Sequence, residues 1–165
     1  MSRTTTLGVA VLAAAFLSTA QAAPLMERNI SQEDALIAYE GVVAECAKTN
    51  STNMTIVVVD RAGQVALMAN SNTASPHNLE LARRKAYTAR TFRVNSIEWR
   101  DRTKGNSAAS GQRQLVDVIP LGGGVPITVA GDVIGGVGVS GASGGQEGDT
   151  ACAKGGADAV TAAAR

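Results

Sequence analysis

The chain has 165 residues, with 15 basic and 14 acidic side chains and a hydrophobic content of 45%. This length suits one domain with a sizeable core and is short for two. Because the net charge is near zero, there is no general electrostatic reason for the chain to bind nucleic acid, and we expect no such partner.

The first 22 residues have the three parts of an export signal. Arg3 supplies a positive charge, residues 7–17 are apolar, and Ala20-Gln-Ala22 is a small-residue cleavage site. The apolar stretch is shorter than the roughly 20 residues that span a bilayer. We therefore expect a signal peptide at 1–22 and a single domain at 23–165. The mature protein would be periplasmic or secreted, without stable membrane insertion.

The next segments have the patterns of a helix and a hairpin. A capping-box pattern begins at Ser31, and apolar residues then recur at helical spacing, which predicts a helix over 32–48. Two runs rich in apolar residues follow, separated by a turn that ends in glycine. They predict a hairpin with strands over 54–60 and 65–69.

A second long helix is predicted after the hairpin. Ser75 can cap it, with Pro76 in the first turn, where a missing amide costs nothing. Ala82, Ala86 and Ala89 share one face of this helix. Because these side chains are small, we expect the helix to lie close against whatever covers it.

The last third of the chain is rich in glycine between short β-branched runs. We expect a short helix near 96–100, a loop, strands over 115–121, 125–129 and 133–140, and a final helix over 149–163. Hairpins joined by helices, rather than strict strand–helix alternation, favour an α+β fold with an antiparallel sheet.

The two cysteines, Cys46 and Cys152, lie on the first and last predicted helices. In an oxidising compartment an even pair is more often a bridge than two free thiols, so we predict a disulfide. Neither cysteine has a second cysteine or a histidine at metal-ligand spacing, which argues against a metal site.

Two glycine motifs near the C-terminus are weak signals of catalysis. Gly136–Gly141 matches G-x-G-x-x-G, but no second strand follows to complete a dinucleotide-binding unit. Gly138–Ala142 is one residue short of a nucleophile elbow, and its serine has no evident base. We expect these glycines to allow close packing of strands or the approach of backbone to a ligand.

Cations and one histidine are the candidate binding groups. Residues 83–104 hold eight basic side chains against two acidic ones. They form either a solvated helix face or a surface for an anionic ligand or a partner subunit. His77, the only histidine, stands at the start of the second long helix, and imidazole is the usual neutral axial ligand of haem iron. No CxxCH motif is present for covalent haem attachment.

Three segments together resemble the GlcG/HbpS family of small ligand-binding domains: Arg84-Lys-Ala-Tyr-Thr-Ala89, Gly123-Gly-Val-Pro-Ile127 and Gly138-Val-Ser-Gly141. The resemblance implies a profilin-like, five-stranded antiparallel sheet flanked by helices. It also implies a homo-oligomer, and several members are described as haem-binding.

Carried over by position, the resemblance places a ligand pocket near a subunit interface, between residues 122–126 and the helix at 83–88. Some relatives have a hydroxyl-bearing residue where this chain has Val125, which cannot ligate iron, so His77 or another side chain would supply the ligand. The candidate binding residues are His77, Leu79, Arg83, Arg84, Lys85, Gly123, Gly124, Val125 and Pro126.

The leading hypothesis is an exported, non-catalytic protein that binds haem or a related tetrapyrrole. A second hypothesis is an enzyme, or an enzyme accessory, acting on a small anionic metabolite such as a hydroxy acid. A third is a structural oligomer without a small ligand. Loss of a haem spectrum in His77→Ala would separate the first hypothesis from the others.

Overall fold

The computed structural model describes residues 22–164, and the predicted signal peptide lies outside the described residues except for Ala22. The elements in chain order are α1 (Gln32–Ala47), β1 (Thr55–Val59), β2 (Val65–Asn70), α2 (Asn78–Phe92), α3 (Ser96–Arg102), the 3-10 helix η1 (Ser110–Gln114), β3 (Gly124–Val129), β4 (Asp132–Ser140) and α4 (Gly145–Ala163). None of the helices in this range is long and apolar enough to cross a membrane.

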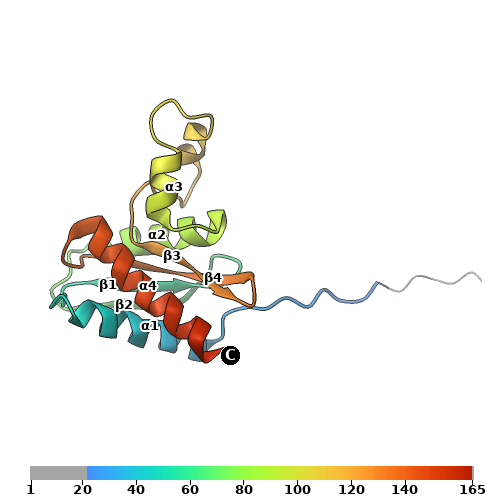
Figure 1. The fold of residues 1–165 in the computed structure, drawn as a ribbon, viewed down its shortest axis with the longest axis horizontal. Coiled ribbons are helices and arrows are strands. Elements are labelled where there is room, and N and C mark those ends of the chain that lie inside the picture. Colours follow the sequence, from blue (N-terminus) through green and yellow to red (C-terminus); the bar gives the residue numbers. More distant parts are fainter. Residues whose placement is uncertain (1–21, 165) are drawn as a thin grey trace, which may run out of the picture.

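The sheet has four strands in the order β2-β1-β4-β3, and every neighbouring pair is antiparallel. The α+β class and the antiparallel sheet are therefore confirmed. Helices α1 and α4 lie against one face of the sheet and α2 against the other (Figure 1). The main apolar core lies between the sheet and the α1–α4 layer.

The predicted fifth strand, over 115–121, is wrong. This segment pairs with no strand and lies along α2 instead. The hydroxyl of Thr88 accepts a hydrogen bond from the Ile119 N–H at 2.9 Å. The guanidinium of Arg84 donates to the carbonyl of Val118. Residues 115–117 form a bend and a turn, with a φ of 67° at Asp117, so the segment is not a continuous strand. The side chains of α2 satisfy its backbone groups in place of a partner strand.

Helix α1 begins with the predicted capping box. The Ser31 hydroxyl accepts from the Asp34 N–H at 3.0 Å, and the Asp34 carboxylate accepts from the Ser31 N–H at 2.9 Å. Cys46 at its end is joined to Cys152 of α4 by a disulfide with a Cα–Cα distance of 5.1 Å, the pairing that the sequence predicts. Together these contacts fix α1 at both ends.

Helix α2 packs closely on the sheet, as its alanine face predicts. A Cβ atom added at Gly138 would lie 2.1 Å from the carbonyl oxygen of Ala82, and one at Gly136 would lie 2.7 Å from that of Ala86. Only glycine fits these positions of β4. The expected cap at Ser75 is wrong, because the N-cap position is His77, whose side chain makes no capping hydrogen bond.

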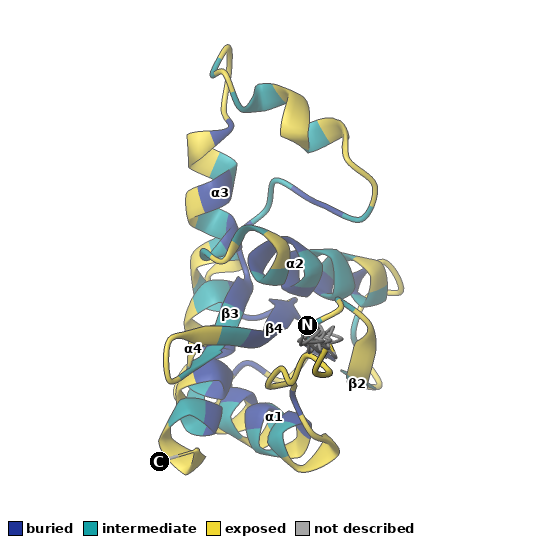
Figure 2. Ribbon diagram, turned by 90° about the vertical axis from the view of Figure 1, so that its right-hand side faces the viewer, coloured by how far each residue is buried: buried dark blue, intermediate teal, exposed yellow. Residues whose placement is uncertain are grey.

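Residues 96–121, which we call the arm, project from the body of the domain (Figure 2). Trp99 of α3 is 1% exposed and stacks on Phe92 at the end of α2, with 4.7 Å between ring centroids. The indole N–H of Trp99 also donates to Gln112 of η1 at 3.2 Å. One tryptophan therefore anchors the arm to the body and holds its two helical pieces together.

Candidate functional site

The basic side chains near the middle of α2 point in different directions. Successive residues of a helix are about 100° apart around its axis. Lys85 is buried, whereas Arg83 and Arg84 are half-buried beside the arm. The predicted cluster of cations is therefore divided between the interior and the surface.

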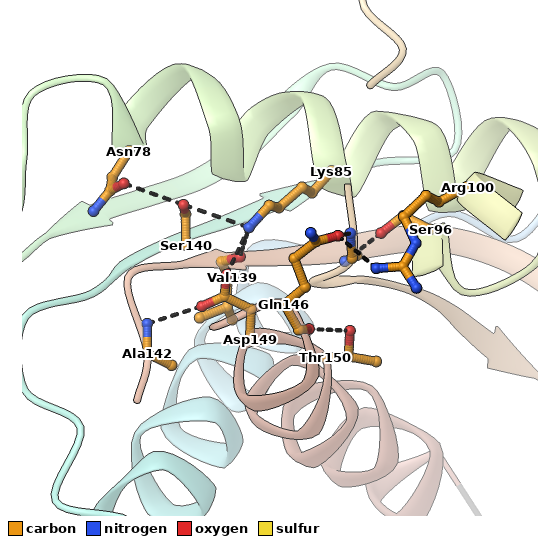
Figure 3. A network of polar contacts seen from close by, with 12 residues as sticks. Asn78, Lys85, Ser96, Arg100, Val139, Ser140, Ala142, Gln146, Asp149 and Thr150 are labelled. Carbon is orange, nitrogen blue, oxygen red and sulfur yellow. Dashed lines mark hydrogen bonds and ion pairs between the residues drawn. The ribbon is translucent and has the colours of Figure 1, made fainter. Parts of the chain in front are cut away.

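Lys85 reaches through the interior to the start of α4, where its Nζ lies 2.6 Å from an Asp149 carboxylate oxygen (Figure 3). The two side chains are 3% and 7% exposed. The same amine donates to the carbonyl oxygen of Val139 at 3.1 Å. Its charge is thus met by an anion and a backbone acceptor, as a buried ammonium requires.

Further polar groups complete this buried network. The Ser140 hydroxyl donates to the side-chain oxygen of Asn78 at 3.2 Å, and Asp149 accepts from the Ala142 N–H at 2.8 Å. Burial raises the pKa of Asp149 above its ordinary value, and Lys85 opposes that rise. The network joins the beginning of α2, the end of β4 and the first turns of α4.

Gly123, just before β3, and Gly124, the first residue of β3, lie close to Lys85. A Cβ at Gly123 would lie 3.0 Å from the Lys85 side chain and 2.7 Å from that of Asp149, and one at Gly124 would lie 2.0 Å from the Lys85 carbonyl oxygen. The backbone φ of Gly123 is +118°, which favours glycine. In this chain these glycines bring the loop close to α2. The Lys85 amine in turn forms its ion pair with Asp149.

Arg83 and Arg84 fasten the arm to the outer side of α2. Arg83 makes ion pairs with Glu80, at 2.9 Å, and with Asp117 of the arm, at 2.7 Å. Hydrogen bonding to these carboxylates, chiefly to Glu80, raises the pKa of Arg83, and the pairing lowers the pKa of Glu80. Arg84 keeps its Nε buried without a hydrogen-bond partner among the described residues.

His77 is exposed at the N-terminal end of α2, and Leu79, two residues further along, is half-buried. His77 and Arg84 are seven residues apart, which places them on one face of a helix. The arm segment that Arg84 holds also contains two exposed apolar side chains, Leu115 and Val116, at 54% and 81% exposure. We call His77, Arg84, Leu115 and Val116 together the α2–arm surface, which offers an imidazole, a cation and uncovered apolar groups.

Val125 and Pro126 lie elsewhere. Val125 is 7% exposed and belongs to the apolar core, while Pro126 is half-buried. Both border a hollow of about 370 Å³ between β3, the β3–β4 turn and α4, and His77 is not among the lining residues. The structure thus brings Lys85, Gly123 and Gly124 together but does not join His77 to Val125 and Pro126.

Sequence reasoning missed the partners of Lys85, namely Asp149, Asn78 and Ser140. One signal could have found them, because Lys85 lies three residues after Ala82 and four before Ala89, on the buried face of α2. Among residues 22–164 no group of three or more histidine, cysteine or acidic side chains could hold a metal ion.

Comparison with known proteins gives a consistent result. Residues 30–158 match the family model described as "Haem degrading protein HbpS-like". The chain is 35% identical over 100 residues to an uncharacterised 15.0 kDa protein from the dhaT-dhaS intergenic region of Citrobacter freundii, covering 58% of this chain and 70% of that protein.

Two solved structures share the fold. A double mutant of Streptomyces reticuli HbpS is 26% identical, with a TM-score of 0.70 over 92% of this chain and 97% of the other. A PduOC:heme complex is also 26% identical, with a TM-score of 0.71 over 79% of this chain and 94% of the other. Since the family model spans most of the domain and these folds agree with it, the chain belongs to the HbpS-like family.

Proposed function

We propose that this chain is an exported, non-catalytic binding protein that takes haem or a related tetrapyrrole on the α2–arm surface, with His77 as the axial ligand. The observation that carries the proposal is the exposed imidazole of His77 at the N-terminal end of α2, in a chain whose fold is shared by the PduOC:heme complex. Family membership supports a haem-binding type of function.

The residues of this surface suit the chemistry of the group. Haem requires an axial donor, apolar walls and partners for two propionates. His77 is the donor, the exposed Leu115 and Val116 are apolar, and Arg84 is a cation on the same face as His77. Leu79, two residues after His77, lies on the opposite side of the helix and is not part of this surface. When bound, haem supplies an iron that accepts an axial nitrogen. This chain's part is to offer that nitrogen and to cover the macrocycle.

We further propose that the protein is a homo-oligomer and that a second copy covers this surface. Leu115 and Val116 are uncovered within one chain, and the edge strand β2 exposes Val65 and Met68 at 46% and 43%. Exposed apolar side chains beside an open sheet edge favour association. A monomeric mass by light scattering at micromolar concentration would contradict this assembly.

A hemin titration of the domain at 23–165 tests the ligand assignment. We expect a Soret band that saturates with hemin in the wild type and a histidine-ligated haem spectrum that is lost in His77→Ala, because no other imidazole exists in the chain. Arg102→Gln on α3, outside the proposed site, is the matched control and should bind like the wild type.

An unchanged spectrum and affinity in His77→Ala would show that the axial ligand is wrong. The same samples also distinguish haem binding from haem degradation, which the description of the family names. If the protein only binds, the Soret band should persist for hours after a reductant is added in air. Steady bleaching that depends on the protein would overturn the non-catalytic part of the proposal.

A further inference from the structure

A group of arginines gathers on the other end of α2, away from His77. Two adjoining hollows, of about 400 and 140 Å³, share Arg61 and Arg90 in their linings. Arg93 borders the larger hollow and Tyr87 the smaller one. The walls come from the β1–β2 turn, the last turns of α2 and the segment before α1. Three guanidinium groups, one from the β1–β2 turn and two from the end of α2, therefore line one concave region.

Of the three arginines, Arg90 has a buried hydrogen-bond donor that is left unpaired. Its Nε is buried and has no hydrogen-bond partner among the described residues. Its pKa is lowered by burial, and further by the like charges of Arg61 and Arg93, while Asp60 and Glu27 act in the opposite direction. A buried guanidinium N–H without an acceptor is costly. The terminal N–H groups of Arg90 also have no acceptor among the described residues, and these are the groups that a ligand in the hollow would meet.

The nearby carboxylates do not compensate all the positive charge. Glu27 pairs with Arg61 at 3.1 Å. One carboxylate oxygen of Asp60 accepts from the Ala62 and Gln64 N–H groups, each at 2.8 Å, within its own turn. Among the described residues Arg90 and Arg93 have no ion-pair partner. Three cations against two anions leave one positive charge at the hollow.

We propose that Arg61, Arg90 and Arg93 form a binding site for a small oxyanion, a carboxylate or a phosphate, distinct from the tetrapyrrole surface. Guanidinium groups bind both anions through paired N–H donors, which gives geometric selectivity as well as charge. The larger hollow, of about 400 Å³, is within the range of small-molecule sites. Tyr87, whose ring packs against Gly63, limits the ligand on the smaller side.

NMR spectroscopy of the arginine side chains tests this site. The Nε–Hε signals of the full domain are followed while sodium phosphate or sodium malonate is added, with sodium chloride at matched ionic strength as the reference. We expect a saturable shift of the Arg90 signal with one or both oxyanions. Phosphate alone indicates a tetrahedral ligand, and malonate alone indicates a carboxylate.

Three variants make the result specific. Arg90→Gln should weaken binding of the active anion by about tenfold, as expected for a lost charge-assisted pair. Arg93→Gln, at an exposed position, provides the same test if Arg90→Gln fails to fold. Arg102→Gln removes the same charge from α3 and should bind within about twofold of the wild type.

The proposal is overturned if neither oxyanion gives a saturable shift, or if Arg102→Gln loses as much affinity as Arg90→Gln. A hemin titration of Arg90→Gln separates this site from the tetrapyrrole surface. We expect hemin binding to be unchanged. An equal loss of hemin binding would show that the two sites are one and would contradict the inference.

Discussion

Lys85 and Arg83 are two residues apart on α2 and carry the same charge, yet they belong to different regions. Lys85 is buried against Asp149 and ties α2 to α4. Arg83 is 26% exposed, pairs with Glu80 on the same helix and joins α2 to the arm through Asp117. The comparison shows that a basic run in a sequence is not a single surface, because the helix turns successive charges into different environments.

We expect the largest loss of unfolding free energy from a change in the interior, Lys85→Met. This change keeps the unbranched stem of the side chain but leaves Asp149 as a buried carboxylate without its cation. Breaking a buried pair from one side costs about 3–5 kcal/mol. Urea unfolding at neutral pH measures the loss. The double variant Lys85→Met/Asp149→Asn should recover part of it, since the unpaired charge is gone, and a single-variant loss below about 1 kcal/mol would contradict a buried pair.

Acid should reduce the deficit of Lys85→Met. Burial already raises the pKa of Asp149 above 3.8, and the variant removes the cation that opposes this rise. A raised carboxyl pKa gives stability that is present below the unfolded-state value and is lost as pH rises through the folded-state value. The variant should therefore approach the wild type as pH falls toward 4. A deficit that stays constant or grows over this range would show that Asp149 is not the group responsible.

We expect the smallest loss of unfolding free energy from a change at the surface, Arg83→Gln. Its ion pairs with Glu80 and Asp117 are partly exposed, and such pairs contribute about 0–1 kcal/mol. The unfolding free energy should fall by no more than this. Hydrogen exchange of residues 115–118 should rise more clearly, because the arm loses one of its fastenings. Arg102→Gln, which should change neither quantity, is the control.

Much of the fold follows from periodicity in the sequence. The capping box at Ser31 predicts the start of α1, and the hairpin of β1 and β2 is where the β-branched runs place it. The final helix begins at Gly145 rather than at residue 149, because glycines near its start hide the helical pattern. Local patterns of this kind predict elements well and their ends less well.

The prediction of a fifth strand was wrong for a physical reason. Residues 115–117 form a bend and a turn, and α2 side chains such as Thr88 satisfy backbone groups that a neighbouring strand would otherwise pair. The apolar residues of this segment indicate a strand, but they do not show the turn at Asp117 or the contact with α2. The partner of Lys85 was hidden in the same way, because Asp149 is 64 residues away. The ligand role of His77 stays a prediction.

A crystal structure of the domain grown with hemin would show where the tetrapyrrole binds. We expect it on the α2–arm surface with its iron bound by the imidazole of His77, while Lys85 stays paired with Asp149 in the interior. A tetrapyrrole in the hollow beside Val125 and Pro126, with His77 free in solvent, would contradict this expectation.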